Sequence, residues 1–494
     1  MNSPIRKVAA GCMLLVLLML ANITFVQAFQ ADDLNARSDN RRVLLDEYAR
    51  ERGPILVGAD NTPIAQSVPT DGEFGYLRQY ANGPLYAPIT GFYSFLFGRS
   101  AIERAENGIL SGDDDRLFVR RLVDLVTNRE RQGGAVKVTI DPAAQQAASD
   151  GLGDFKGAVV ALNPQTGAIL AMVSNPSYDP NLLASHSISE QQAAWDALQE
   201  TAVPEGDRQK PGLNRATAQT LPPGSVFKLV TAAAALESGR YEPDSTVPGP
   251  AAYDLPQSTV NLPNQSGRAC GEGPEQLVTL TEALRVSCNT AFAFLGNDLG
   301  PEALREQADR FGFNSSPLEE LNAAESVFPA ELDPPSTAQS AIGQRDVRAT
   351  PLQMAMVSAA IANDGVLMRP YLVEEVRGPD LVSVIEQTEP EELSRAMSPE
   401  TAEELTRMMV NVVENGTGRN AQIDGVEVAG KTGTAESSED RPPYAWFTSF
   451  APADDAQVAV AVVVEEANVA ATDIAGGRLA APIARQVMEA VLGT

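Results

Sequence analysis

The sequence predicts an α+β protein whose main domain is built on a five-stranded antiparallel sheet flanked by helices. One observation is a hairpin signal, in which a turn at 163–167 separates the apolar runs 157–162 and 168–174. The second is a group of strand-like runs much later in the chain, at 426–430, 445–451 and 456–464. The third is the helical character of the chain between these two groups. Together they favour one sheet beside a helical subdomain, with an amphipathic helix at 480–492 covering one sheet face.

A single membrane-spanning helix is expected at 8–29. This run is apolar apart from three polar residues, and about 20 such residues cross a bilayer. Arg6 and Lys7 precede the run and acidic residues follow it, so 1–7 is expected to be a cytoplasmic tail and the rest extracytoplasmic. The alternative is a signal peptide cleaved after Ala28. The sequence therefore predicts a single-pass protein of the plasma membrane, held by a signal-anchor helix.

Two domains are expected outside the membrane: a small mixed non-catalytic domain at 30–150 and a catalytic domain at 151–494. The boundary is placed in the stretch 149–154, which is rich in Gly and Asp and follows a predicted helix at 143–148. The net charge of −28, from 65 acidic and 37 basic residues, argues against a nucleic-acid partner. One histidine and three cysteines show no metal-ligand spacing, and no cofactor is expected.

The strongest chemical signal is Ser225 followed three residues later by Lys228. Of the six lysines in the chain, only Lys228 has a serine three residues before it. At helical spacing the hydroxyl and the amine share a face, and a helix N-terminus favours negative charge on the serine oxygen. Burial lowers the pKa of a lysine and makes it a usable base. Because His186 is the only histidine, this pair is favoured over a Ser-His-Asp triad; the alternative is a helix-capping serine and a surface lysine.

Two further motifs follow Ser225 in order. Ser-Cys-Asn at 287–289 comes after a helical run, and Lys-Thr-Gly-Thr at 431–434 comes after the strand-like run 426–430. An earlier Ser-Asp-Asn at 38–40 lies in a polar stretch and is interpreted as a solvated stalk. The ordered triple resembles the signature of the penicillin-binding protein and serine β-lactamase superfamily. For the last motif, the alternative is a hairpin turn with an exposed lysine.

The resemblance implies roles for the middle motif. The Ser287 hydroxyl is expected to relay a proton to the leaving group, and Asn289 to orient Lys228 and the substrate amide. The middle residue, Cys288, is expected to pair with Cys270, closing a loop of roughly 17 residues worth about 3 kcal/mol. The alternative is two free, partly buried thiols.

The last motif is expected to hold the substrate. Thr432 and Thr434 offer hydroxyls to a carboxylate, and Lys431 supplies its countercharge. Gly433 removes a side chain where a substrate backbone lies beside the strand. By resemblance, the backbone N–H groups of Ser225 and Thr434 form the oxyanion hole.

The region after the membrane helix resembles the opening of class B penicillin-binding proteins, and the whole chain most resembles the small penicillin-binding protein A type of actinobacteria. The matching segments are 52–55, 60–65, 86–91, 98–103 and 349–355. The resemblance implies the penicillin-binding/β-lactamase-like transpeptidase fold, with Ser225 where the sheet meets the helical subdomain. It also implies that the first domain positions the enzyme without taking part in the chemistry.

The function implied is that of a serine-type D-Ala-D-Ala transpeptidase, which cross-links peptidoglycan stem peptides through a Ser225 acyl-enzyme and is acylated by β-lactams. Such an enzyme serves cell-wall synthesis in cell division or cell shape and is an antibiotic target. By analogy, the expected partners are a membrane glycosyltransferase and divisome or elongasome proteins.

The sequence leaves two other functions open. One is hydrolysis, as a D,D-carboxypeptidase or β-lactamase. A deacylating Glu-x-x-Leu-Asn element is suggested near Asn322, but Leu318 occupies the required glutamate position, so the spacing fails unless Glu319 serves instead. The other rival is a non-catalytic membrane sensor or scaffold. A sensor needs several membrane helices and an intracellular output domain, for which a seven-residue tail is too short.

Overall fold

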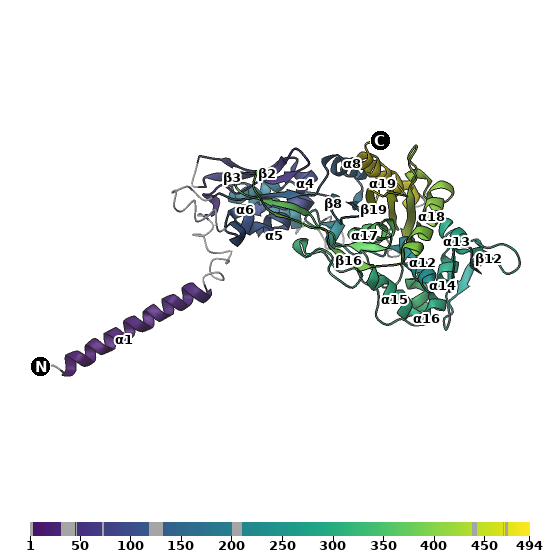
Figure 1. Ribbon diagram of the computed structural model, residues 1–494, viewed down its shortest axis with the longest axis horizontal. Coiled ribbons are helices and arrows are strands. Elements are labelled where there is room, and N and C mark those ends of the chain that lie inside the picture. Colours follow the sequence, from purple (N-terminus) through teal and green to yellow (C-terminus); the bar gives the residue numbers. More distant parts are fainter. Residues whose placement is uncertain are drawn as a thin grey trace.

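The computed structural model describes residues 3–30, 45, 47–71, 74–117, 132–199, 210–436, 442–467, 469 and 473–494. Figure 1 shows a long helix that extends away from a two-part body, with a smaller sheet domain next to it and a larger domain farther away. The N-terminus lies at the free end of this helix, and the C-terminus lies on the larger domain near α8 and α19.

The larger domain contains the predicted five-stranded antiparallel sheet. Its strands, in spatial order, are β17 (Ala429–Ala435), β18 (Tyr444–Ala451), β19 (Val458–Glu466), β7 (Lys156–Leu162) and β8 (Ile169–Asn175). The early hairpin therefore joins the late strands through the pairing of β19 with β7, in which Ala461 lies opposite Val160. The α+β class and the composition of this sheet are confirmed.

Both faces of this sheet are covered by helices, because its central strands are apolar on both sides. Along β19, the even-numbered valines pack with α8 (Pro142–Leu152) and α19 (Gly476–Leu492), while Ala459, Ala461 and Val463 face the main core. Figure 1 shows α8 and α19 together on one side of β19 and α17 (Pro351–Ala362) on the other. The C-terminal helix is amphipathic as predicted, and it begins four residues earlier than expected.

A helical subdomain packs beside this sheet and α17. Its helices are α12 (Lys228–Glu237), α13 (Leu280–Arg285), α14 (Asn289–Leu299), α15 (Pro301–Arg310), α16 (Pro334–Ser340) and α18 (Pro399–Asn415). The helical run expected just before Ser287, at 277–286, is shorter in the structure, because its first three residues form strand β12 (Leu277–Thr279). Thr279 then caps α13 by accepting a hydrogen bond from the Glu282 N–H.

The smaller domain is built on a six-stranded sheet that combines distant parts of the chain. Its order is β15 (Val384–Gln387), β14 (Val373–Arg377), β6 (Ala135–Val138), β1 (Ile55–Val57), β2 (Thr62–Pro69) and β3 (Tyr76–Tyr80). The short helices α4 (Gly83–Thr90), α5 (Ala101–Ala105) and α6 (Asn107–Ser111) accompany it. Two of its strands thus come from inside the segment expected to be wholly catalytic.

The boundary expected at 149–154 lies at the end of α8 in the structure. Ala144, Ala148 and Leu152 of α8 are buried against the five-stranded sheet and α19, so this helix packs with the larger domain. The preceding strand, β6, belongs to the smaller sheet. We therefore propose that the two domains divide between Val138 and Pro142.

A buried ion cluster joins the N-terminal segments 52–55 and 98–103, which carried the family resemblance. Glu103 accepts from Arg52 Nε at 2.6 Å, from Arg78 Nε at 2.7 Å and from the Tyr80 hydroxyl at 3.0 Å. All four side chains are buried, and the carboxylate is satisfied on both oxygens. Close packing also requires Gly53, where a Cβ would lie 1.8 Å from a neighbouring carbonyl oxygen.

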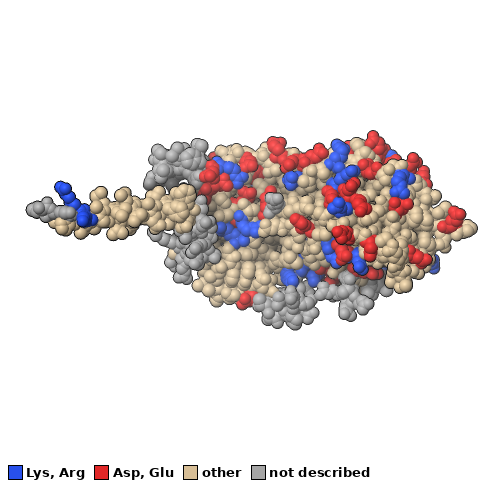
Figure 2. All heavy atoms as spheres, turned by 90° about the horizontal axis from the view of Figure 1, so that it is seen from below, with Lys and Arg blue, Asp and Glu red and all other residues tan. Residues whose placement is uncertain are grey.

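The isolated N-terminal helix has the length and composition of a membrane span. The helix Pro4–Gln30 covers 27 residues, and an 18-residue window within it has a mean hydropathy of 2.3 and is not buried in the structure. It comprises α1 (Ser3–Phe25) and a π-helical turn, Val26–Gln30. Figure 2 shows basic side chains at the free end of this helix and none along the remainder of it.

Candidate active site

Ser225 lies on a short 3₁₀ turn that leads into α12. The turn, Gly224–Phe227, replaces the α-helical start predicted from the sequence. Gly224 has φ +56°, and its N–H donates to the Gly343 carbonyl at 2.9 Å. A Cβ at Gly224 would lie 3.0 Å from the Thr434 carbonyl oxygen. Glycine therefore allows the turn that carries Ser225 to lie directly against β17.

Lys228 is fully buried and its amine is held by neutral groups. Nζ donates to Asn289 Oδ1 at 2.7 Å and to the Ser287 carbonyl at 2.8 Å, and it lies 3.3 Å from Ser287 Oγ. No carboxylate among the described residues bonds to this amine. Burial, and then the nearby charge of Lys431, hold the pKa of Lys228 well below its usual range. The structure thus places the motif that contains Lys228 next to the motif at 287–289, as predicted.

Lys431 is the third residue of β17 and is also fully buried. Its Nζ donates to Ser287 Oγ at 2.9 Å and to the Thr432 carbonyl at 2.8 Å. Burial lowers the pKa of Lys431 to about 7. The sequence predicted a strand that ends at Lys431. In the structure, β17 begins at Ala429 and continues past Lys431 to Ala435. In the structure this amine bonds to Ser287 and to its own strand, and its role as countercharge to a substrate carboxylate stays a prediction.

Ser287 forms the corner between α13 and α14. Its φ of +59° is in the left-handed region, which is uncommon for a non-glycine residue and is held here by the Ser287 N–H bond to the Leu284 carbonyl at 3.1 Å. The next residue, Cys288, is joined to Cys270 in a disulfide, with Cα atoms 6.1 Å apart. This bond connects the corner to the wall of the adjacent cleft.

An open cleft of about 650 Å³ runs between β17 and this corner. From the three motifs it is lined by Ser225, Ser287, Cys288, Thr432, Gly433 and Thr434. The Ser225 side chain is half-buried and makes no hydrogen bond within the described part of the chain. Lys228 and Lys431 lie behind the cleft surface, and both contact Ser287. The structure thus brings the three predicted motifs to one place.

The structure gives a second reason for a glycine at position 433, besides the expected room for a substrate backbone. A Cβ at this position would lie 3.0 Å from Trp446 Cβ and 3.1 Å from both the Pro223 carbonyl oxygen and Val226 Cγ1. The absent side chain therefore makes room for the turn that carries Ser225. Its neighbour Thr432 bonds to the Thr417 hydroxyl at 2.6 Å, a partner that no motif indicated.

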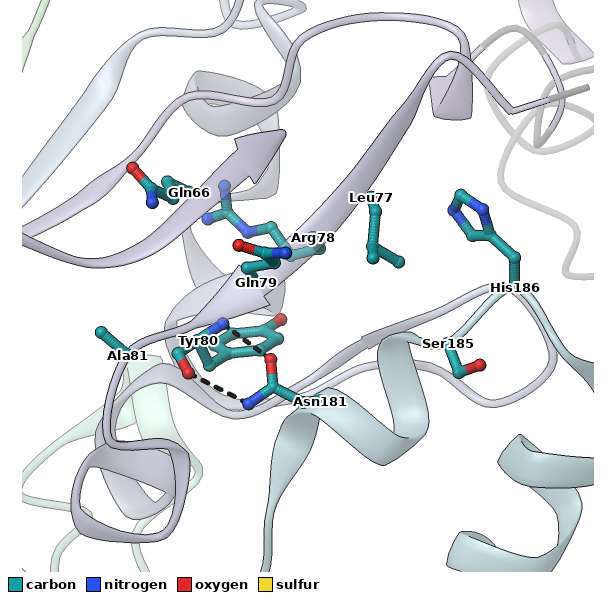
Figure 3. Close-up of a pocket in the computed structure, with 9 residues that line it drawn as sticks. All are labelled: Gln66, Leu77, Arg78, Gln79, Tyr80, Ala81, Asn181, Ser185 and His186. Carbon is teal, nitrogen blue, oxygen red and sulfur yellow. Dashed lines mark hydrogen bonds between the residues drawn. The ribbon is translucent and has the colours of Figure 1, made fainter. Parts of the chain in front are cut away.

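His186 lies in a separate pocket of about 420 Å³ beside β3 (Figure 3). Its Nε2 is 3.2 Å from the Tyr76 carbonyl oxygen, while the Asn181 side chain bonds to both the N–H and the carbonyl of Tyr80. This pocket and the cleft have no lining residue in common. The single histidine is therefore not positioned to act on Ser225, which leaves lysine as the nearby base.

Several cleft residues were not predicted from the sequence. They come from segments without a motif and include Asn264, Arg268, Thr417, Asn420, Gly476 and Arg478. Polar residues of these kinds are common in loops, so only the fold reveals their convergence. The earlier Ser-Asp-Asn at 38–40 lies outside the described residues.

Comparison with known proteins identifies the family. A family model for the penicillin binding protein transpeptidase domain matches residues 157–489, and one for the penicillin binding protein A dimerisation domain matches 52–136. The chain is 49% identical to the peptidoglycan D,D-transpeptidase PbpA of Mycolicibacterium smegmatis, over 100% of this chain and 99% of that one. It is 47% identical to PbpA of Mycobacterium tuberculosis with the same coverage.

Solved structures show the same fold. The ceftriaxone acyl-enzyme of penicillin-binding protein A from M. tuberculosis superposes with a TM-score of 0.85 at 47% identity, covering 91% of this chain and 100% of that one. Its penicillin G acyl-enzyme gives a TM-score of 0.82 at 47% identity, covering 90% and 100%.

The chain belongs to the penicillin-binding protein family, in its class with a transpeptidase domain. Within that family it is similar along its whole length to the penicillin-binding protein A of mycobacteria, which confirms the resemblance found in the motifs.

Proposed function

We propose that this protein is a serine-type peptidoglycan D,D-transpeptidase that forms its acyl-enzyme on Ser225. The observation that carries the proposal is the buried amine of Lys228, which has only neutral hydrogen-bond partners among the described residues and lies beside Ser287. Desolvation lowers the pKa of a lysine, which enlarges the uncharged fraction that can accept a proton. The activity named for the mycobacterial relatives supports the same conclusion.

In the first half-reaction, Lys228 Nζ takes the proton of Ser225 as Oγ attacks the penultimate D-Ala carbonyl of a stem peptide. The backbone N–H groups of Ser225 and Thr434 stabilise the oxyanion. Collapse of the tetrahedral intermediate breaks the C–N bond to the terminal D-Ala. The leaving nitrogen receives a proton through the Ser287 hydroxyl, which contacts both Lys228 and Lys431.

In the second half-reaction, the amine of a neighbouring stem peptide attacks the Ser225 ester. The amine loses a proton to the lysine pair, the new C–N bond forms, and Oγ leaves with a proton. β-Lactams acylate the same oxygen, and the amine of the opened lactam stays attached to the acyl group, so it keeps the position that the acceptor needs. Structures of the M. tuberculosis relative as ceftriaxone and penicillin G acyl-enzymes support this step.

Transfer is favoured over hydrolysis by the position of the segment that resembles a deacylating element. In the amide orientation that satisfies both groups, Asn322 accepts from the Arg104 guanidinium of α5. Arg104 also bonds to the Glu320 carbonyl at 3.4 Å. This segment thus packs on the smaller domain, and Asn322 lines a different pocket from Ser225.

The membrane arrangement and the protein partners are part of the proposal. Arg6 and Lys7 lie at the free end of α1, which supports a cytoplasmic N-terminus and an extracytoplasmic catalytic domain. We propose that the smaller domain holds the enzyme near a membrane glycosyltransferase and cell-division or elongation proteins. No polymerase domain is expected in the smaller domain, so glycan strands must come from such a partner.

The proposal is tested with the full chain in detergent, a stem-peptide donor ending in D-Ala-D-Ala, and an amine acceptor. Mass spectrometry separates the transfer product from the hydrolysis product. We expect wild type to form the transfer product, Ser225→Ala to form neither, and Ser383→Ala, at an exposed serine outside the cleft lining, to match wild type. Hydrolysis without transfer, or product from Ser225→Ala, would contradict the proposal.

A further inference from the structure

Helix α14, which begins at the catalytic motif, has no capping side chain of its own. Cys288 stands at its N-cap position and makes no side-chain cap hydrogen bond, since its sulfur is in the disulfide with Cys270. Helix N-caps usually carry an oxygen acceptor, because the first N–H groups have no partner inside the helix. The Thr290 N–H is fully buried in this first turn and needs an acceptor from elsewhere.

That acceptor is the side chain of Asn264, in a loop distant in sequence. Asn264 Oδ1 accepts from the Thr290 N–H at 3.1 Å. Asn264 Nδ2 donates to the Pro250 carbonyl and to the Arg268 carbonyl, each at 2.9 Å. Only 5% of this residue is exposed, and the two donors and the acceptor each face a fitting partner.

Asn264 is one step removed from the groups that act on Ser225. The preceding residue, Pro263, accepts from Asn289 Nδ2 at 3.2 Å, and Asn289 Oδ1 accepts from Lys228 Nζ at 2.7 Å. Pro263 and Asn264 therefore bond to Asn289 and Thr290, the two residues that start α14. Thr290 also bonds to Pro250 through its hydroxyl at 2.8 Å, which closes the connection.

We infer that Asn264 is a positioning residue for acylation: it caps α14 from outside the helix and thereby fixes Asn289 against Lys228. The inference rests on the proposed function. Without the amide, a buried N–H and two carbonyls lose their partner, and the first turn of α14 shifts away from the lysine. The disulfide keeps the cleft wall attached to the corner, so the main loss is in alignment of the groups around Ser225.

The test compares acylation by a fluorescent penicillin in wild type and Asn264→Ala, using the full chain in detergent. We expect the rate constant at saturating penicillin to fall by about tenfold or more, while the half-saturating concentration changes less than about twofold. Asn181→Ala is the matched control, because Asn181 also bridges backbone groups with its amide but lies in the other pocket. It is expected to acylate like wild type.

Asn264→Asp tests the cap itself. Aspartate keeps an oxygen for the Thr290 N–H but turns its other oxygen toward the two carbonyls that had accepted from the amide, so we expect its acylation rate constant to fall by about threefold, less than in Asn264→Ala. A loss in Asn264→Asp as large as tenfold, an unchanged rate in Asn264→Ala, or an equal loss in Asn181→Ala would overturn the inference. Wild type that fails to be acylated would instead overturn the proposed function. If Asn264→Ala does not fold, the aspartate variant is compared with wild type, and an unchanged rate there would overturn the inference.

Discussion

Lys431 Nζ and Ser287 Oγ are joined by a 2.9 Å hydrogen bond, although they lie 144 residues apart in the chain. The same hydroxyl lies 3.3 Å from Lys228 Nζ. Ser287 thus stands between two buried amines, and a charge on Lys431 disfavours a second charge on Lys228. We propose that this arrangement favours the uncharged amine of Lys228 and provides a path for the proton that it accepts.

The pH dependence of acylation tests the coupling between the two lysines. Acylation needs uncharged Lys228, so its rate rises with pH through the pKa of that amine. Burial and then the Lys431 charge lower this pKa. Lys431→Ala removes the repulsion and raises the pKa of Lys228, so the acid limb of the rate profile should move to higher pH. Penicillin acylation rates between pH 5 and 9 measure this shift.

Lys156→Ala is the control for that experiment. Lys156 pairs with Glu466 at 2.9 Å at the start of β7 and makes no contact with the cleft lining. Its profile should overlay that of wild type. A Lys431→Ala limb at or below the wild-type position would contradict the coupling.

Stability should also increase with pH because of Lys431. Its pKa is lowered to about 7 by burial, from an ordinary value of 10.5, so the unfolded chain binds more protons between these two values. The free energy of unfolding therefore rises with pH across that window, by at most about 1.4 kcal/mol per pH unit for one lysine. Denaturant unfolding at several pH values should show a shallower rise in Lys431→Met. An equal slope in both proteins would show that the amine titrates normally.

The buried carboxylate of Glu103 should be essential to the smaller domain. Glu103→Ala leaves Arg52 and Arg78 buried without their shared partner, and breaking such a pair typically costs about 3–5 kcal/mol. Chemical denaturation should record this loss. Glu403→Ala, which removes an exposed pair with Arg407, is expected to cost under about 0.5 kcal/mol. Similar values for the two variants would refute the importance of the cluster.

Gly433→Ala should impair the enzyme through the turn that carries Ser225. The added methyl would meet Trp446 and the Pro223 carbonyl, and overpacking of this kind costs about 1–3 kcal/mol. We expect slower acylation by both small and large β-lactams, because the turn itself moves. Gly378→Ala serves as the control, because Gly378 lies in the turn after β14, where the nearest atom to an added Cβ is an oxygen of the flexible Asp380 side chain, at 3.3 Å. Loss confined to bulky substrates would instead favour the original interpretation that Gly433 only accommodates substrate.

The sequence identified the parts of the site that carry recognisable local chemistry. Ser225 and Lys228 were found by their spacing, and the strands around 157–174 and 426–464 by their apolar periodicity. These signals are local, so the chain displays them without a fold. The sequence also predicted that the two groups of strands join in one antiparallel sheet, but their order, with β19 beside β7, comes from the structure.

Features that depend on long-range packing were not predicted. The burial of Lys431 and its bond to Ser287 require β17 to pass beneath the corner between α13 and α14. The cap supplied by Asn264 crosses between segments with no shared motif. Strand β14 joins β6 in the other domain, which no local pattern indicates. The 3₁₀ turn at Ser225 depends on contact with Gly343, far along the chain.

The most direct test of activation of Ser225 by Lys228 is mass spectrometry of the full chain after treatment with penicillin G. We expect one penicilloyl group per chain, located on the peptide that contains Ser225 and released slowly. We also expect Lys228→Met, with its fold confirmed by circular dichroism, to acquire this group about a hundredfold more slowly. An adduct on another residue, or labelling of Lys228→Met at the wild-type rate, would contradict activation of Ser225 by Lys228.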